Sequence, residues 1–517
     1  MARYKDYDYS QGKFIPIHFD KQILPGTFEY SLHYLIDNKI DLSLFDLRYR
    51  NDDTGAPAYD PAILLKIILY AYSRGITSSR KIAQCCRQNI IFMALSANTE
   101  PHFTTIADFI SSSGQEIIDL FLEVLLICDE MGLIGKEMFA VDGCKLPSNA
   151  SKEWSGTKEE LRKKRGKMER AILQIVKRHR EVDAREADRG VIEQEEQYVE
   201  TLRGKVKKIK AWLRDNEDKP GKSGKPLKSN ITDNESAKMK TSHGVIQGYD
   251  GVAVIDGKHQ VVVHAAAFGA AQEHDLLIPM IEGARENFEA IGNKQDVFGK
   301  AKLTADSGFH TEANMKEVMQ QGIDGYIADT QFRKRDPRFS EVDKYKERFR
   351  KERAEYYGAA NVYRPHRDFT ISEDKTHCIC PAGKRLYRNG GNVIVNGNKA
   401  VKFRGRKTDC RVCEFRENCL RHPDSTEARQ VYFFQGSAGS RPETFTQKMK
   451  RKIDSIKGRL IYNRRLGTAE PVFGNICSTI GLNRFSLRGK RKVNTQWVLY
   501  CAVHNLFKVH RYGLEFA

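Results

Sequence analysis

The sequence predicts an α/β protein with two inserts, and the order of its segments is the basis for this prediction. Short apolar segments typical of strands alternate with helical segments over residues 136–329. Helical patterns fill residues 1–135 and return over residues 436–517. A charged helical segment interrupts the chain at 157–215, and a basic, turn-rich segment with five cysteines does so at 330–435. We therefore expect an α/β core in two parts, preceded by a helical N-terminal domain and completed by C-terminal helices.

The length, charge and cysteine content restrict the class of protein. With 517 residues, the chain exceeds one ordinary hydrophobic core. The net charge of +19 favours a polyanionic partner, either nucleic acid or an anionic membrane surface. The best apolar run, Ile63–Tyr72, is about half a membrane span and contains Lys66, and no signal peptide is visible. Eleven cysteines without an export signal indicate a reducing cytoplasm, where clustered thiols favour metal binding over disulfides.

The first 135 residues read as several short helices joined by tight turns. Asp60 and Pro61 are typical of a helix start, and the segment 61–73 is apolar on most faces. Three shorter helical segments follow, at 80–87, 90–95 and 104–109. This arrangement suits a helix-turn-helix-like reader of DNA, although any small helical bundle has the same pattern. We favour DNA binding for this region.

Two heptad-like stripes predict an antiparallel helical hairpin over 157–215. The first stripe has Leu161, Met168, Ile175 and Val182, and the second has Ile192, Val199, Val206 and Leu213. Residues 183–190 would form the turn. With 18 basic and 12 acidic residues, the hairpin fits contact with DNA or with a partner protomer. A solvated hairpin that packs only on itself explains the pattern equally well.

Two predicted strands end in an aspartate that is followed by a small residue. Asp142 follows the apolar run 138–141, and Asp306 follows the strand 302–305. Carboxylates at the ends of neighbouring strands can share a metal ion, and a third one from a helix would complete a two-metal site. Glu470 is the candidate, because it is nearly the only acid in a very basic segment. The alternative is that these aspartates cap turns, as most strand-end aspartates do.

The C-terminal segment carries most of the excess positive charge. Residues 441–517 contain 16 Lys and Arg but only 4 Asp and Glu, a net charge of +12. Aromatic residues are interleaved with these charges. Such a segment can pack into a core and still follow the phosphates of DNA, and we favour this interpretation over a simple solvated face.

The same segment contains the most specific motif of the chain. It has Tyr462, Arg465, Glu470-Pro-Val-Phe-Gly-Asn-Ile, Arg484-Phe and Leu-Arg488-Gly. With Asp142 and Asp306, this pattern resembles bacterial insertion-sequence transposases of the DDE class, whose signature around the third carboxylate is Tyr–Arg–Glu–Lys. The resemblance implies an RNase H-like mixed sheet flanked by helices. Two departures are visible: the spacing from Arg465 to Glu470 is one residue longer than usual, and Cys477 stands where the Lys is expected.

The resemblance also implies a site and a reaction. Asp142, Asp306 and Glu470 would hold two Mg²⁺ ions, for which Mn²⁺ would substitute. DNA phosphate would be contacted by Tyr462, Arg465, Arg484 and Arg488. The reaction would be cleavage at the terminal inverted repeats of an insertion sequence, followed by strand transfer into target DNA.

The resemblance further implies double-stranded DNA as the partner and a homodimer assembled on it in the nucleoid of a bacterial cytoplasm. Two alternatives remain: a related metal-dependent nuclease, and a catalytically inactive DNA-binding protein derived from a transposase.

The cysteine-containing insert suggests a second metal. Its five cysteines are Cys378, Cys380, Cys410, Cys413 and Cys419. Two thiolate pairs about thirty residues apart can form a tetrahedral Zn²⁺ site, with the fifth cysteine replacing one ligand. Reduced thiols packed in a small β-rich insert are the alternative.

Overall fold

The computed structural model divides the chain into two compact units. The larger unit comprises residues 1–329 and 449–517, and the smaller unit comprises residues 330–448. The structure describes residues 10, 16–48, 57–181, 189–221, 224–241, 244–336, 368–390, 393–395, 398–420, 423–437 and 443–513. Each unit is described by itself below.

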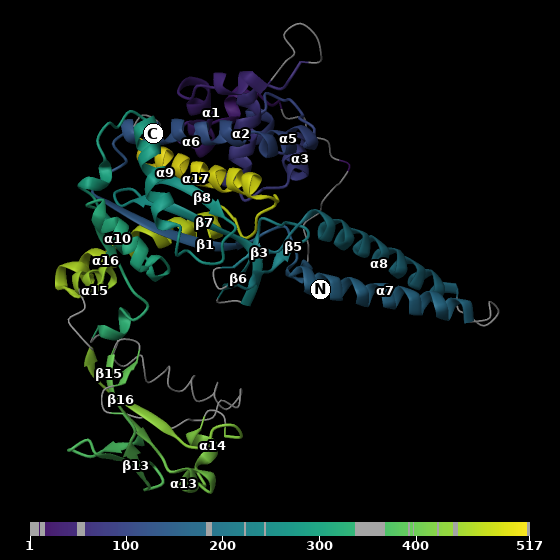
Figure 1. Ribbon diagram of the computed structural model, residues 1–517. Helices are drawn as coiled ribbons and strands as arrows, with labels where there is room; N and C mark the ends of the chain where they lie inside the picture. Colours follow the sequence, from purple (N-terminus) through teal and green to yellow (C-terminus); the bar gives the residue numbers. More distant parts are fainter. Residues whose placement is uncertain are drawn as a thin grey trace, which may run out of the picture. The chain divides into compact units, whose positions relative to one another are not determined.

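A six-stranded mixed sheet forms the centre of the larger unit (Figure 1). Its order is β10-β9-β1-β7-β6, and β8 also pairs with β7. The strands are β1 (Met138–Pro147), β6 (Ala237–Thr241), β7 (Gly244–Asp256), β8 (Val262–Phe268), β9 (Lys302–Ala305) and β10 (Asp324–Ile327). β1, β9 and β10 run parallel, whereas β7 is antiparallel to β1, β6 and β8. The predicted α/β class is therefore confirmed.

The register of the parallel strands brings the two predicted aspartates together. Val141 of β1 pairs with Ala305 of β9. Each strand continues with an aspartate, so Asp142 and Asp306 follow at the same level at the carboxyl edge of the sheet. On the other side of β1, Asp142 is opposite Ala253 of β7.

The N-terminal helices belong to the same compact unit as the sheet. They are α1 (Phe28–Asn38), α2 (Pro61–Ser73), α3 (Ser79–Gln88), α4 (Ile90–Leu95), α5 (Phe103–Ser112) and α6 (Gly114–Glu130). The prediction for α2 is confirmed in both bounds, and the side chain of Asp60 caps it by accepting from the Ala62 N–H. The apolar composition of α2 is explained by burial, because nearly all of its residues from Leu64 onward are inside the protein.

The C-terminal helix α17 (Lys490–Tyr512) lies between the N-terminal helices and the sheet (Figure 1). It packs against β8 on one side and against α6, α2, α1 and α5 on the other. Its Trp497 is fully buried, and the indole N–H donates to the Val252 carbonyl at 3.0 Å. Asn505 makes two 2.8 Å hydrogen bonds with the N–H and carbonyl of Val262, which satisfies backbone groups of the edge strand β8.

The remaining helices of the core cover the two faces of the sheet. They are α9 (Leu277–Ala290), α10 (Glu312–Gln320), α15 (Phe445–Asp454) and α16 (Ile456–Gly474), which continues as a π-helical turn, Asn475–Thr479. Phe139 of β1 contacts Phe288 of α9 on one face of the sheet. β1 also contacts α16, which lies on the other face. Because side chains alternate along a strand, Asp142 points to the α16 side of the sheet.

Two long helices form an arm, as predicted (Figure 1). They are α7 (Lys158–Glu181) and α8 (Arg189–Asp215), which pack along each other. A small apolar cluster of Leu161, Ile209 and Trp212 closes the base of the arm. The predicted stripe residue Val182 and most of the predicted turn lie outside the described residues. Two short strand pairs follow the base, β2 (Ser155–Gly156) with β5 (Ser229–Asn230) and β3 (Lys219–Pro220) with β4 (Pro226–Leu227).

The smaller unit contains an antiparallel sheet of order β11-β12-β13-β15-β14, with β16 paired to β15. Its strands are β11 (Thr370–Ile371), β12 (His377–Ile379), β13 (Arg385–Arg388), β14 (Val393–Val395), β15 (Asn398–Arg404) and β16 (Gln430–Ser437). Two short helices, α13 (Lys407–Arg411) and α14 (Arg416–Cys419), lie between β15 and β16. The core of this sheet is small, with seven buried residues that include Cys378, Phe403 and Val431.

Short 3₁₀ turns complete the description. They are Phe19–Gln22, Ser43–Arg48, Lys152–Trp154, Val297–Gly299, Ser307–Phe309 and Arg333–Arg335. Within the residues that the structure describes, no helix is both long enough and apolar enough to cross a membrane.

Candidate active site

Asp142 occupies the point where β1 passes the end of β9. Its Oδ1 accepts a 2.9 Å hydrogen bond from the Gly143 N–H. Its Oδ2 accepts from Nη1 of Arg465 at 2.5 Å. Arg465 comes from the middle of α16 and is only 8 % exposed, so this ion pair is largely removed from solvent. A residue predicted to contact phosphate is thus bound to a residue predicted to bind metal.

Asp306 ends β9 and also caps the turn that follows. Its Oδ1 accepts a 2.7 Å hydrogen bond from the Gly308 N–H, so the alternative role as a turn cap is observed here. A Cβ added at Gly308 would overlap Oε2 of Glu273 and lie 3.0 Å from Oδ1 of Asp306. The carboxylates of Glu273 and Asp306 therefore approach each other across this glycine, which explains why the turn needs a residue without a side chain.

Three further charged residues lie at this edge of the sheet, and the sequence reasoning missed them. Lys145 of β1 forms a 3.0 Å ion pair with Glu273, which precedes α9. Lys145 is also paired in register with Asp250 of β7, which is fully buried. The signal that would have found Asp250 is a carboxylate next to a glycine inside an otherwise apolar strand. A Cβ at Gly143 would lie 2.9 Å from Oδ1 of Asp250, so the small residue after Asp142 makes room for it.

The carboxylates at this site have raised pKa values. Burial, opposed by the Arg465 charge and reinforced by Asp306 and Glu273, raises the pKa of Asp142 to about 6. Burial and then the charge of Glu273 raise the pKa of Asp306 as well. For Asp250, burial and Glu273 raise the pKa to about 8. Acids crowded in this way gain stability from a cation placed between them.

Tyr462 and Arg465 both reach this site from α16. The Arg465 guanidinium lies 5.7 Å from the centre of the Tyr462 ring, which is a cation–π geometry. Burial raises the pKa of the Tyr462 hydroxyl, whereas Arg465 lowers it and both aspartates raise it. The structure therefore brings four predicted residues together: Asp142, Asp306, Tyr462 and Arg465.

Glu470 is not brought to the two aspartates. It lies on α16, five residues after Arg465, which places it about 140° around the helix and about 7.5 Å along it. Its side chain is exposed, whereas the neighbouring Ala469 and Val472 are buried. Among the described residues, no group of three or more His, Cys, Asp or Glu side chains is arranged to hold a metal ion.

Arg484 and Arg488 lie beside the strand that carries Asp142. Arg484 donates from Nε to the Ser148 carbonyl at 3.0 Å, and Arg488 does the same to the Asn149 carbonyl at 2.7 Å. Both side chains are exposed. Each arginine thus fixes the segment after β1 with one edge of its guanidinium group.

Cys477, at the position where a lysine was expected, lies in the π-helical turn after α16. Its thiol hydrogen-bonds with that of Cys144, two residues after Asp142, and this contact lowers the pKa of Cys477. The position therefore faces the core beside the site.

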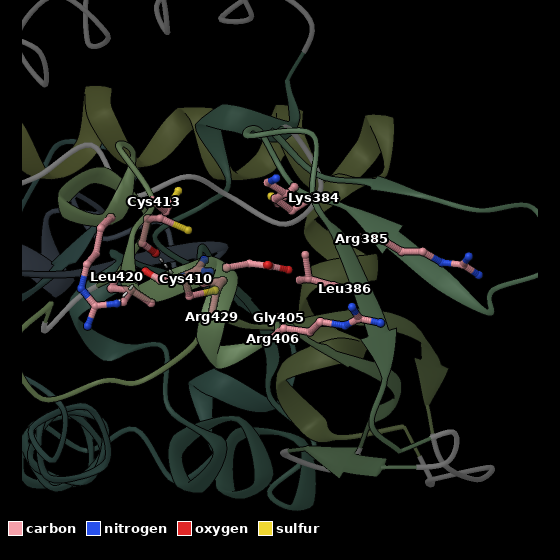
Figure 2. Close-up of a pocket in the computed structure, with 13 residues that line it drawn as sticks. Lys384, Arg385, Leu386, Gly405, Arg406, Cys410, Cys413, Leu420 and Arg429 are labelled. Carbon is pink, nitrogen blue, oxygen red and sulfur yellow. Dashed lines mark hydrogen bonds between the residues drawn. The ribbon is translucent and has the colours of Figure 1, made fainter.

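Four of the five predicted zinc ligands line one pocket of the smaller unit (Figure 2). They are Cys380, Cys410, Cys413 and Cys419. In Figure 2, Cys410 and Cys413 lie on the helical side of the pocket, and Lys384 and Leu386 lie on the strand side. Cys378 does not line the pocket, because it is fully buried in the core of the sheet.

Comparison with known families finds two matches. Residues 379–510 match the family model described as a transposase DDE domain, and residues 17–112 match one described as a transposase domain of the DUF772 type. Both describe transposases, and they cover the two ends of the chain. Both matches support an insertion-sequence DDE transposase. No curated protein matches the sequence.

The matched regions contain some of the predicted site residues and not others. The match to the DDE domain contains Tyr462, Arg465 and Glu470. It begins at residue 379, after Asp142 and Asp306. The geometry of the sheet edge, rather than the family match, is what joins the two aspartates to Arg465. A DDE transposase domain belongs to enzymes of the polynucleotidyl transferase type.

Proposed function

We propose that this transposase binds the terminal inverted repeats of an insertion sequence and cleaves and transfers DNA strands at the edge of the sheet that carries Asp142 and Asp306. The observation that carries the proposal is the parallel register of β1 and β9, which extends to these two aspartates. The antiparallel strands β1, β7 and β8 are followed along the chain by β9 and β10, which run parallel to β1, and this order supports the proposal of an RNase H-like sheet.

The aspartates fit Mg²⁺ or Mn²⁺. Mg²⁺ is commonly held by one or two carboxylates together with substrate phosphates and water. Asp142 and Asp306 supply such oxygens, and burial, with a smaller effect of the Glu273 charge beside them, raises the pKa of both. A bound ion of this kind activates water or a 3′-hydroxyl and stabilises the leaving oxygen. We propose Glu470 as the third carboxylate of a two-ion site, and the cleavage experiment below tests this residue by itself.

Arg465 is the residue whose role changes when DNA binds. Without DNA it neutralises Asp142 through the 2.5 Å ion pair. A guanidinium group also binds phosphate with two parallel hydrogen bonds. In the proposed complex Arg465 leaves Asp142 for a DNA phosphate beside Tyr462, and Arg484 and Arg488 contact the backbone nearby.

The exposed face of α3 is the proposed site of duplex recognition in the N-terminal region. Arg80, Lys81 and Gln84 are exposed on it, whereas Ile82 and Cys86 are buried against the other helices. Arg87 is exposed too and forms a 2.9 Å ion pair with Glu100. A short amphipathic helix with a basic outer face suits the major groove.

The deciding experiment is cleavage of a labelled duplex that carries the terminal repeat of the element. Wild type is compared with Asp306→Asn and Glu470→Gln in Mg²⁺, Mn²⁺ and EDTA, and Glu282→Gln on the exposed surface of α9 is the matched control. We expect nicking in both metals by wild type and the control, and none by the two site variants. All four proteins should still shift the duplex in a gel.

Other results would redirect the proposal. Wild-type cleavage rates in Glu470→Gln would remove Glu470 from the site and leave the two aspartates. Cleavage without joining of the element end to a target duplex would favour a nuclease. Binding without cleavage by wild type would favour an inactive DNA-binding protein, and Cys477→Lys would then be the first change to test for recovery.

Two ends must be held together for strand transfer, so we also propose a homodimer on DNA in the bacterial nucleoid. Mass measurement of the complex with a single end duplex tests this. Two chains and two duplexes are expected, and one chain on one duplex at saturating concentrations would contradict it.

A further inference from the structure

We propose that the smaller unit holds one structural Zn²⁺ ion with four thiolate ligands, namely Cys380, Cys410, Cys413 and Cys419. The site is separate from the carboxylates of the larger unit, and the proposed DNA chemistry does not require it. Its role would be to attach the two short helices α13 and α14 to the turn between β12 and β13.

The shape of the pocket supports a single ion. All four cysteines line it, and it encloses about 30 Å³. A space of this size is enough for an ion or a water molecule. Cys378 is excluded as a ligand, because it is fully buried among Leu386, Phe403 and other apolar residues of the sheet core.

The local backbone presents one pair of thiols and two single thiols from three places in the unit. Cys380 begins a tight turn in which its N–H donates to the Lys384 carbonyl at 3.0 Å and its carbonyl accepts from the Gly383 N–H at 2.8 Å. Cys410 and Cys413 are separated by two residues at the end of α13. Cys419 ends α14. A Cys-x-x-Cys pair on one segment with further cysteines on others is the usual composition of a structural zinc site.

The stability of α13 and α14 is the second argument. These helices have five and four residues, and neither buries a side chain nor has a side-chain cap. Helices of this length are unstable by themselves in water. Arg416 donates to the Cys410 carbonyl, and Arg429 donates to the Cys419 carbonyl. Glu427 forms ion pairs with Lys407 and Arg411 of α13, and Cys419 packs against the sheet core. A metal bond between three cysteines of this segment and Cys380 would add a further attachment to these contacts.

The charges around the pocket suit a four-thiolate site. The four cysteines line one pocket together with several basic side chains. Zn²⁺ with four thiolates carries a net charge of about −2, and basic side chains that line the pocket offset it: Lys384, Arg385, Arg406, Arg416 and Arg429.

Binding requires the thiols to converge. In the part of the chain that the structure describes, the four sulfur atoms are not gathered at coordination geometry. Each cysteine has one side-chain torsion, χ1, about which its sulfur atom can rotate. Rotation of these side chains, with a small movement of the two short helices, would close the site.

The test is the zinc content of the full-length protein, purified under reducing conditions without chelator and measured by elemental mass spectrometry. We expect one zinc per chain in wild type, and loss of that zinc in Cys410→Ser and Cys413→Ser. Three controls should keep it: Cys378→Ala, which removes the excluded thiol, Asp409→Asn, which removes the acid that lines the pocket, and Asp142→Asn, which alters the carboxylate site.

A second measurement on wild type alone avoids dependence on the folding of variants. Replacement of zinc by Co²⁺ should give the intense thiolate-to-cobalt absorption of a tetrahedral site, and chelation should make four additional thiols reactive to a thiol reagent. Zinc-free wild type that gives no such absorption would overturn the proposal. Retention of zinc in both serine variants, or its loss in a folded Cys378→Ala, would overturn the ligand assignment.

Discussion

Replacement of Asp142 by asparagine should make the protein more stable at alkaline pH, although it removes a buried ion pair. The pKa of Asp142 is raised from about 3.8 to about 6 in the folded protein, and this shift already includes the favourable effect of Arg465. At about 1.4 kcal/mol for each pH unit, ionised Asp142 costs the folded state about 3 kcal/mol. Asparagine has the same shape and does not ionise, so the variant avoids this cost.

The sign of the pH dependence follows from the direction of the shift. Because the folded protein binds the proton of Asp142 more tightly than the unfolded chain does, the contribution of this residue to stability is present below pH 4. It is lost as the pH rises through about 6. The Asp142→Asn variant should therefore gain over wild type between pH 4 and 6 and keep a constant advantage above that.

The assay is thermal unfolding at pH 4.5 and pH 8 without divalent metal. For a unit of roughly 400 residues, about 3 kcal/mol corresponds to a rise in Tm of about 4 °C at pH 8, and roughly a third of that rise is expected at pH 4.5. Asp108→Asn, an exposed change on α5, is the control and should alter Tm at neither pH. Equal shifts at the two pH values, or a lower Tm for Asp142→Asn at pH 8, would refute the reasoning.

Metal addition gives the same experiment a second readout. If Mg²⁺ binds between the ionised aspartates, it stabilises the folded state by mass action. Millimolar Mg²⁺ should then raise the Tm of wild type at pH 8 and have no effect on Asp142→Asn. An equal response of the two proteins would show that the ion binds elsewhere.

Three other changes test separate parts of the structure. Trp497→Ala should lower the free energy of unfolding by about 3–5 kcal/mol, because it empties a fully buried site. Urea unfolding measures this loss, and a loss below about 1 kcal/mol would contradict the packing of α17. Trp212→Ala should loosen the base of the α7–α8 arm, because it removes a side chain of the apolar cluster there. Limited proteolysis should then cut the arm faster, while the Tm of the core stays unchanged. A parallel fall in Tm would mean that the arm and the core unfold together. Lys81→Ala should weaken binding to all duplexes alike and reduce the slope of log affinity against log salt by about 1, whereas an unchanged slope would remove this residue from the DNA interface.

Much of the core was predictable because its signals are local. The bounds of α2, α4 and β9 agree with those predicted, since a proline start, a buried apolar run or a short strand before Asp306 is visible in a few residues. Strand β1 was predicted only as far as Val141, yet it continues to Pro147. The residues after Asp142 are half-buried and mixed in polarity, so their pairing with β7 leaves no clear pattern in the sequence.

The site itself was only partly predictable. Asp142 and Asp306 were predicted because a strand end is a local feature, and Arg465 because of the motif around it. Asp250 and Glu273 reach the site through the pairing of β7 with β1 and the start of α9, which are contacts between distant segments. The exposure of Glu470 could not be read from the sequence either, because it depends on which face of α16 packs against the sheet.

The position of α17 has a consequence for synthesis of the enzyme. A chain emerging from the ribosome presents the N-terminal helices and all strands of the central sheet before residues 490–512 exist. Until then, the surfaces that Trp497 and Asn505 later cover are open to water, and the edge of β8 offers unpaired backbone groups. A message cut short before α17 should therefore yield a chain prone to degradation or aggregation rather than a weak transposase. Only chains that contain α17 would then be available for the proposed reaction on DNA.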